Sequence, residues 1–486
     1  MVYLVTNTPE FFGDICDEIR LFLDVRHIEQ KDEPEKEGFC IVHRLEEDGA
    51  FAHTCFLFKD GVEVSSATHH APLADALDEL EYKKIRKRGA KISVFRCLKA
   101  YFGEERPWGS LTGVRPSKLL RDSRASLGSK AADKLFYEEF DISKKKLDLL
   151  KVIADQQDPV IGSAKENDID LYFGIPFCTS RCAYCSFSSA LTTGDGSAEG
   201  AYVEALLREV ELLEDLIAQK NVRNIYIGGG TPTALSAKQL EKVVTKAAKW
   251  AKGEFTVEAG RPDTITREKL AILIDAGVNR LSVNPQSTCD ETLKKIGRVH
   301  TAREFFEAAK MAAEFGFDVI NMDLIVGLPG EGRDEFFRSL GDVLALEPGN
   351  ITVHTLAIKR ASKFGMENAK SFADRQEAEA ILEESQQLLA EKGYLPYYLY
   401  RQKYMAGNLE NVGYARPGAV CEYNIDIMEE VASILAFGAG GISKKVWRDP
   451  KLRIQRAPAV KDIRHYVTRT QEMAERKRDL FMGGDC

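Results

Sequence analysis

Three cysteines lie close together in the segment FGIPFCTSRCAYCSF at residues 173–187. Cys178, Cys182 and Cys185 have the spacing C-x3-C-x2-C, and the next cysteine or histidine is the distant Cys289. A compact zinc site needs four such ligands. A four-iron cluster held by three thiolates instead of four would leave one iron open to another ligand. The spacing therefore predicts an iron–sulfur site with an open position; a chance group of buried thiols or an atypical zinc loop is the alternative.

The segments that must position these cysteines alternate between two patterns. From about residue 166, short apolar runs typical of strands alternate with amphipathic helical segments. The strand-like runs begin near residues 170, 224, 254, 280, 318 and 350, and the clearest helical segments are 202–220, 237–252, 301–315 and 375–392. Six strand–helix units fall short of the eight in a closed barrel. We expect an α/β fold, a partial (β/α)6 barrel.

In such folds, ligand-binding residues gather where the parallel strands end. The cysteines follow the first strand and the turn GGGTPT, residues 228–233, follows the second; the later strands carry or end at Glu258, Asn284, Gln286, Asp323 and His354. The fold would bring these residues to one rim. Each also has a simpler interpretation when taken alone, such as a tight turn for GGGTPT or a surface carboxylate for Glu258. Asp323 lies among apolar residues, so it needs a partner. Arg298 is one candidate, although an isolated arginine is more often exposed.

The flanking regions predict two further domains. Residues 1–165 show a strand at 2–6, a helix from Phe11 to Leu23, two strands around an Asp-Gly turn at 48–49, and helical periodicity from Leu73 to Phe102 with a break near Gly89. We expect an N-terminal α+β accessory domain at 1–165, the barrel at 166–395, and a C-terminal α+β extension at 396–486 that covers the barrel.

Composition narrows the class of protein. The 486 residues include 67 basic and 75 acidic residues, a net charge of −8, which argues against a general nucleic-acid binder. The first residues do not resemble a signal peptide, and no apolar run approaches the roughly 18 residues of a membrane span. We therefore expect a cytoplasmic protein whose other, scattered cysteines are buried and reduced.

The cysteine spacing resembles that of radical S-adenosylmethionine (SAM) enzymes. Further segments, YFGIPFC, YIGGGTPT, FTVEAGRPDTI, NPQS, IGRVHT and DLIVGLPGE, resemble the oxygen-independent coproporphyrinogen III oxidase (coproporphyrinogen dehydrogenase) family over about residues 170–445, and its longer bacterial HemZ-type members most. The resemblance implies a [4Fe-4S] cluster whose open iron binds SAM, and an electron that cleaves SAM to a 5′-deoxyadenosyl radical. The protein then supplies binding and orientation.

The resemblance also implies roles for individual residues. The three cysteines would be the cluster ligands and the catalytic centre. The implied SAM-binding residues are Tyr172 for the carboxylate, Gly229, Gly230 and Thr231 for the amino group, Glu258 for the ribose, and Gln286, Arg298 and Asp323 to complete the pocket. Tyr184 is the aromatic residue that precedes the last cysteine, and it belongs to the same expected site.

The implied reaction is the oxidative decarboxylation of two propionates of coproporphyrinogen III, which gives protoporphyrinogen IX in haem biosynthesis. Reduced flavodoxin or ferredoxin would donate electrons. Because the porphyrinogen carries four carboxylates, we expect cationic partners. The candidates follow the sixth strand and are Lys359, Arg360, Arg401 and Lys403.

Two positions depart from the family pattern. Phe187 stands where authentic coproporphyrinogen dehydrogenases carry a fourth cysteine, and Ile442 stands where a related glycine-rich element carries a histidine. The related haem chaperones also have Phe after the cluster, so a haem-binding or haem-delivery protein that retains the cluster and SAM is the alternative. Its iron ligand would be His300, His354 or Cys421. Radical chemistry on RNA is the least favoured reading.

Overall fold

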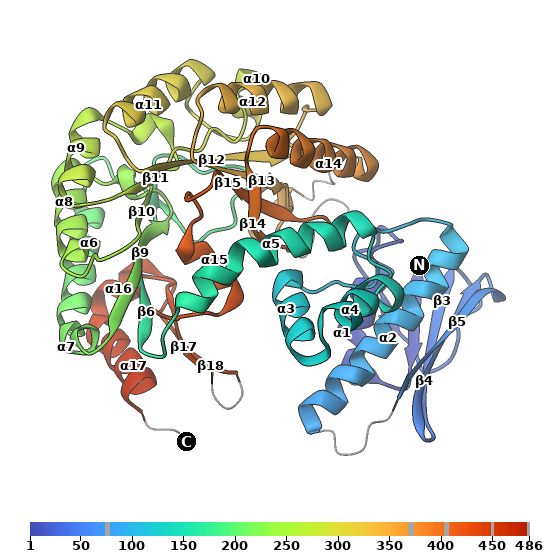
Figure 1. Ribbon diagram of the computed structural model, residues 1–486. Coiled ribbons are helices and arrows are strands. Elements are labelled where there is room, and N and C mark those ends of the chain that lie inside the picture. The colour runs from blue at the N-terminus through green and yellow to red at the C-terminus, as the bar shows by residue number, and fades with distance from the viewer. Residues whose placement is uncertain (73–77, 368–373, 403–407, 449–451, 484–486) are drawn as a thin grey trace. The chain divides into compact units, whose positions relative to one another are not determined.

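Figure 1 shows the computed structural model of the chain. It describes residues 1–72, 78–367, 374–402, 408–448 and 452–483. Contacts within the chain divide it into two compact units, Met1–Lys151 and Val152–Cys486. The finer division into three domains, with boundaries at residues 165 and 395, stays a prediction.

The first unit contains a five-stranded sheet in the order β2-β1-β3-β4-β5. The strands are β1 (Val2–Thr6), β2 (Glu29–Gln30), β3 (Phe39–Glu47), β4 (Ala50–Lys59) and β5 (Val62–Pro72), and the helices that start in this unit are α1 (Phe12–Ile19), α2 (Glu79–Phe102), α3 (Pro116–Leu127), α4 (Ser129–Lys134) and α5 (Lys144–Ser163). The predicted hairpin is confirmed, with Gly49 at φ +66° in its turn. Strand β5 is an additional strand after a second Asp-Gly turn at residues 60–61.

Helix α2 runs unbroken past Gly89, so the predicted break there is wrong. A Cβ atom on Gly89 would lie 2.3 Å from Cδ2 of the buried His53 on β4. The glycine therefore permits close packing of α2 against the sheet instead of ending a helix. The first predicted helix is also shorter, since α1 ends at Ile19, and residues 73–77 lie outside the described residues.

The second unit confirms the six strand–helix units. Strands β6 (Asp168–Ile175), β9 (Asn221–Gly229), β10 (Phe255–Glu258), β11 (Arg280–Ser282), β12 (Val319–Val326) and β13 (Asn350–Thr355) pair in parallel. Their helices lie outside the curved sheet (Figure 1): α6 (Ser197–Glu211), α7 (Glu214–Ala218), α8 (Ala237–Ala248), α9 (Arg267–Asp275), α10 (Asp290–Lys295), α11 (Ala302–Glu314), α12 (Arg333–Ala345) and α14 (Arg375–Glu391). The parallel order brings the carboxyl ends of the strands to one rim.

C-terminal strands extend this sheet at both edges. Antiparallel β15 (Asn411–Ala415) and β14 (Leu395–Tyr400) follow β13, while β16 (Ser433–Phe437) pairs in parallel with β6 and continues into β17 (Ile442–Trp447) and β18 (Arg453–Pro458). The eleven-stranded sheet is open and does not close into a barrel. The remaining helices are α13 (Lys363–Met366), α15 (Glu422–Glu429), α16 (Ile463–Thr468) and α17 (Thr470–Met482). Among the described helices, none has the length and apolar character needed to cross a membrane.

A buried ion pair fixes the C-terminal helices on α6. Lys477 of α17 pairs with Glu209 of α6, and both side chains are buried. The hydroxyl of Tyr466 donates to Glu209 Oε2 over 2.6 Å, and the backbone N–H of Gly438 donates to the same oxygen over 3.0 Å. Glu209 therefore also anchors the glycine-rich turn between β16 and β17.

Candidate functional site

The three cysteines lie on a loop whose backbone is held from several sides. Cys178 ends the short strand β7 (Phe177–Cys178), which pairs with β8 (Ala190–Leu191). Further along the loop, the N–H of Ala183 donates to the carbonyl of Ile296 over 2.9 Å. The carbonyl of Ala183 accepts from the N–H of Phe364 over 3.0 Å. The loop is thus tied to the segments that follow the fourth and sixth barrel strands.

The cysteine side chains do not surround a single point. In the described part of the chain, no group of three or more His, Cys, Asp or Glu side chains is arranged to hold one metal ion. Cys182 is buried, whereas Cys178 and Cys185 are partly exposed. Cysteine thiolates are the side chains that hold iron–sulfur clusters in proteins, so the loop carries the ligand type that the resemblance implies.

The glycine-rich segment packs directly against the strand that leads into this loop. The N–H of Gly230 donates to the carbonyl of Ile175 over 2.8 Å, and that of Thr231 donates to the carbonyl of Phe177 over 2.7 Å. A Cβ atom on Gly230 would lie 2.6 Å from the carbonyl oxygen of Phe177. Thr231 Oγ1 lies 3.5 Å from Cys178 Sγ. Only glycine allows this approach between the two segments.

Glu258 lies at the end of β10 beside the glycine-rich segment. Its carboxylate accepts hydrogen bonds from the hydroxyl of Tyr226 and, over 3.3 Å, from the backbone N–H of Gly229. Burial raises the pKa of Glu258 to about 7; nearby Asp323 adds to the rise, and the Tyr226 hydrogen bond opposes it. Tyr172 stacks near Tyr226, with ring centroids 6.3 Å apart. Tyr172, Gly229 and Glu258 belong to the predicted group, and the structure adds Tyr226, which the sequence analysis did not name.

Gln286 and Asp323 meet on the neighbouring strands. The N–H of Gln286 donates to the carbonyl of Asp323 over 2.9 Å, and Gln286 has φ +67°. Among the residues that the structure describes, its buried Oε1 has no hydrogen-bond partner. Asp323 Oδ2 lies 3.5 Å from His354 Nε2. Burial opposes the charge of Asp323, but the hydrogen bond and charge of His354, with the amide of Asn321, hold its pKa below the usual value.

Arg298 contacts Tyr184 instead of the Asp323 partner considered from the sequence. Its Nη2 donates to the Tyr184 hydroxyl over 3.1 Å, and its Nη1 donates to the carbonyl of Gly260 over 2.9 Å. The guanidinium is buried, so it is not the exposed charge of the simpler interpretation. In the described part of the chain, its Nε has no hydrogen-bond partner. Although burial lowers the pKa of Arg298, Tyr184 and Cys182 raise it above its ordinary value.

The polar atoms around the site fit the expected small cofactor. SAM presents an amino group, a carboxylate and ribose hydroxyls, and it therefore offers both donors and acceptors. The unpartnered acceptor of Gln286 and the unpartnered donor of Arg298 match such a ligand. The closely packed glycine-rich segment fits SAM, and the thiols of the cysteine loop fit an iron–sulfur cluster.

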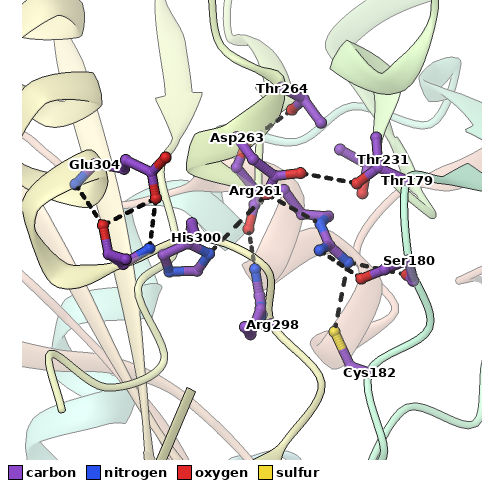
Figure 2. A network of polar contacts seen from close by, with 12 residues as sticks. Thr179, Ser180, Cys182, Thr231, Arg261, Asp263, Thr264, Arg298, His300 and Glu304 are labelled. Atoms are coloured by element: carbon purple, nitrogen blue, oxygen red, sulfur yellow. Dashed lines mark hydrogen bonds and ion pairs between the residues drawn. The ribbon is translucent and has the colours of Figure 1, made fainter. Parts of the chain in front are cut away.

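Figure 2 shows a polar network that the sequence does not reveal, centred on Arg261. Arg261 Nη1 lies 3.7 Å from Cys182 Sγ and donates to the carbonyl of Ser180 over 2.9 Å. Its Nη2 donates to Ser180 Oγ over 2.7 Å. Arg261 lies in the segment FTVEAGRPDTI, which carries the family resemblance, but the segment alone does not show that the fold brings this side chain to the cysteine loop.

The two departures from the family pattern are both exposed. Phe187 is 60% exposed and Ile442 is 52% exposed. Among the cationic candidates, Arg360 is exposed and Arg401 is buried, with Nη2 donating to the carbonyl of Asn408 over 2.7 Å. Lys359 is partly buried, and Lys403 lies outside the described residues.

Comparison with known proteins decides the family. Residues 172–343 match the model of the radical SAM superfamily. The oxygen-independent coproporphyrinogen-III oxidase-like protein HemZ of Bacillus subtilis (strain 168) is 39% identical over 414 residues, which cover 83% of this chain and 82% of the relative. The chain belongs to the radical SAM family of oxygen-independent coproporphyrinogen-III oxidase-like proteins. Membership of the radical SAM superfamily implies a [4Fe-4S] cluster and SAM.

Other members of the family carry a different name. The protein called heme chaperone HemW in Escherichia coli (strain K12) is 30% identical over 288 residues, which cover 58% of this chain and 72% of the relative. Among solved structures, coproporphyrinogen III oxidase (HemN) from Escherichia coli matches with a TM-score of 0.52 at 24% identity, over 66% of this chain and 73% of that one. The structural match confirms the predicted radical SAM fold.

Proposed function

We propose that this radical SAM family member is an enzyme that removes the carboxyl groups of two propionates of coproporphyrinogen III and leaves vinyl groups. The observation that carries the proposal is the joined cysteine loop and glycine-rich segment, flanked by the unpartnered polar atoms of Gln286 and Arg298. The 39% identity to an oxidase-like relative over most of both chains supports the substrate class.

In the proposed site, this chain's residues bind and orient the two cofactors. Cys178, Cys182 and Cys185 hold the cluster. The residues that hold SAM are Tyr172, Tyr184, Gly229, Gly230, Thr231, Glu258, Gln286, Arg298 and Asp323. Bound together, the cluster and SAM supply radical chemistry. The carboxylate of Glu258 lies at the end of its strand, where it would accept a hydrogen bond from a ribose hydroxyl. The hydrogen bond from Tyr226 would rearrange first.

The proposed reaction balances for each propionate. One hydrogen atom would pass from the β-carbon to the radical that bound SAM supplies, the carboxylate leaves as carbon dioxide, and one electron passes to an external acceptor, so that a vinyl group remains. We propose that reduced flavodoxin or ferredoxin donates the electrons and that the protein is cytoplasmic. Arg360 is the exposed cation of the described candidates and would contact a substrate carboxylate.

A second candidate function rests on Phe187. This exposed phenylalanine occupies the place of a fourth cysteine, and a relative named heme chaperone is 30% identical over 288 residues. A haem-binding or haem-delivery protein that keeps the cluster and the SAM site is therefore the alternative. An exposed aromatic beside the cluster loop offers an apolar contact for a flat macrocycle.

An anaerobic assay distinguishes the two functions. The protein is reconstituted with iron and sulfide, supplied with SAM, reductant and coproporphyrinogen III, and followed by mass spectrometry. Substrate-dependent deoxyadenosine together with protoporphyrinogen IX supports the enzyme. Deoxyadenosine without a decarboxylated porphyrin indicates another substrate, and stoichiometric haem binding without either product supports the haem-delivery protein.

A further inference from the structure

Arg261 is a buried cation aimed at one of the three clustered cysteines. The residue is 3% exposed, and its Nη1 lies 3.7 Å from Cys182 Sγ. The same guanidinium donates to both the carbonyl and the hydroxyl of Ser180. One side chain from the turn after the third barrel strand thus contacts the cysteine loop at two residues of the C-x3-C segment, Ser180 and Cys182 (Figure 2).

A carboxylate fixes the direction in which Arg261 points. Asp263 Oδ1 lies 3.3 Å from Arg261 Nε, and Asp263 Oδ2 accepts from the hydroxyl of Thr179 over 2.8 Å. Asp263 lies in the short turn Pro262–Thr264 that follows Arg261. Thr179 and Ser180 are the residues that directly follow Cys178. The network therefore ties both ends of the guanidinium to the loop.

Arg261 pairs with Asp263 through Nε, and its two Nη atoms point to the cysteine loop. Its Nη atoms face neutral Ser180 and the thiol of Cys182, while Asp263 reaches only Nε. Buried charges in proteins are normally paired. A thiolate of Cys182 bound to a cluster would place negative charge directly against Nη1, in the direction in which this atom already donates.

We infer that Arg261 is a positioning residue that raises the reduction potential of the cluster by donating a hydrogen bond to the sulfur of Cys182. This inference rests on the proposed function, because it requires that Cys182 bind the cluster. A reduced cluster carries one more negative charge than an oxidised one. A nearby buried cation and an N–H···S hydrogen bond stabilise that extra charge, and such contacts are known to set cluster potentials.

The test is a redox titration of the reconstituted full chain, followed by the electron paramagnetic resonance signal of the reduced cluster. Two variants change the charge and the geometry separately: Arg261→Gln removes the charge, and Arg261→Lys keeps it but loses the fork of donors. For Arg261→Gln, the ratio of reduced to oxidised cluster at a fixed potential should fall about tenfold, equal to about 59 mV for one electron. Arg261→Lys should show a smaller fall in the same direction.

The matched control is Arg267→Gln, six residues further along the chain. Arg267 is exposed and pairs with Glu314 at the surface, so its loss should leave the potential unchanged. Iron and sulfide contents are measured for every sample, so that potentials are compared at equal loading. If Arg261→Gln does not retain a cluster, Arg261→Lys decides, and an unaltered potential in that variant overturns the inference.

The outcomes separate the inference from the proposed function. If the unaltered protein takes up no cluster, the proposed function fails, and the inference fails with it. If all samples load fully and both Arg261 variants titrate like the unaltered protein, only the role of Arg261 is overturned. A potential that falls in the order Arg, Lys, Gln supports it, because a purely structural clamp would change the loading and leave the potential where it was.

Discussion

The backbone N–H of Gly230 donates to the carbonyl of Ile175 over 2.8 Å, and this bond joins the glycine-rich segment to the strand that enters the cysteine loop. The proposed SAM-binding and cluster-binding segments are thus neighbours at the level of the backbone. A substitution in one segment should therefore alter the other segment as well.

We expect Gly230→Ala to disturb both proposed cofactors. The new Cβ would lie 2.6 Å from the carbonyl oxygen of Phe177 and 2.9 Å from that of Ile175, and backbone atoms must move to avoid it. SAM affinity, measured by equilibrium dialysis of the reconstituted protein, should fall at least tenfold. The control is Gly341→Ala on α12, where no described atom beyond the adjoining backbone of its own helix lies within 4 Å of the new Cβ, and SAM affinity should stay the same. Equal affinities in both variants would contradict the close packing.

Cys182→Ala should abolish most of the cluster. Two thiolates cannot hold a four-iron cluster in place of three, and Arg261 would lose its sulfur partner. Iron and labile sulfide per chain after anaerobic reconstitution are the measurement. Cys97→Ala removes an equally buried cysteine of the first unit and should leave both contents unchanged. Full loading of Cys182→Ala would show that this cysteine is not a ligand.

Glu258→Gln should stabilise the cofactor-free protein at pH 8 but not at pH 4. The folded-state pKa of about 7 exceeds the ordinary 4.5, so the charged form costs stability above pH 7 and the cost vanishes below 4.5. At pH 8 the gain should be roughly 1–3 kcal/mol in the free energy of unfolding. Thermal melting at the two pH values measures it, with the exposed Glu307→Gln as the control. A gain of the same size at both pH values would rule out the raised pKa.

Two stacked histidines should make the first unit sensitive to acid. His43 Nε2 lies 3.1 Å from His53 Nδ1, and burial lowers the pKa of His43 to about 4 and that of His53 to about 3, from an ordinary 6.5. Because the unfolded chain binds these protons first, stability should fall as the pH drops from 6.5 towards 4, by up to about 1.4 kcal/mol per pH unit for each histidine.

Hydrogen exchange of the β3 and β4 amides in the full chain measures this slope, after correction for the intrinsic pH dependence of exchange. The variant His43→Gln should have a shallower slope than the unaltered protein, since one titrating group is gone. His465→Gln changes an exposed histidine and should keep the slope. Exchange that is independent of pH across this range in the unaltered protein would show that the histidines do not oppose folding.

The sequence predicts the repeating part of the fold well. Apolar runs and helical periodicity locate all six parallel strands and their main helices, because each element must bury one face or stripe. The cysteine spacing and the GGGTPT turn are local patterns, so their positions at neighbouring strand ends follow directly once the strands are placed. The structure brings Thr231 to 3.5 Å from Cys178 Sγ.

Features that depend on distant partners are not visible in the sequence. Gly89 suggests a helix break in the sequence, but in the structure it allows α2 to pack closely against His53 on β4. Gln286 adopts a positive φ that no neighbouring residue indicates. Arg261 belongs to the family-like segment FTVEAGRPDTI, but its contact with Cys182 appears only once the turn after β10 is folded. In each case a tertiary contact, and not a local preference, decides the outcome.

The parallel pairing of β16 with β6 has a consequence for how the chain is made. Ser433 of β16 pairs with Ile169 of β6. The partner of the first barrel strand is therefore synthesised about 260 residues after it, which takes roughly 15 to 50 s at usual rates of synthesis. Until then, one edge of β6 stays unpaired, and exposed strand edges invite association with other chains. We therefore expect the nascent barrel to depend on chaperones, and truncation before β16 to yield aggregates instead of a smaller enzyme.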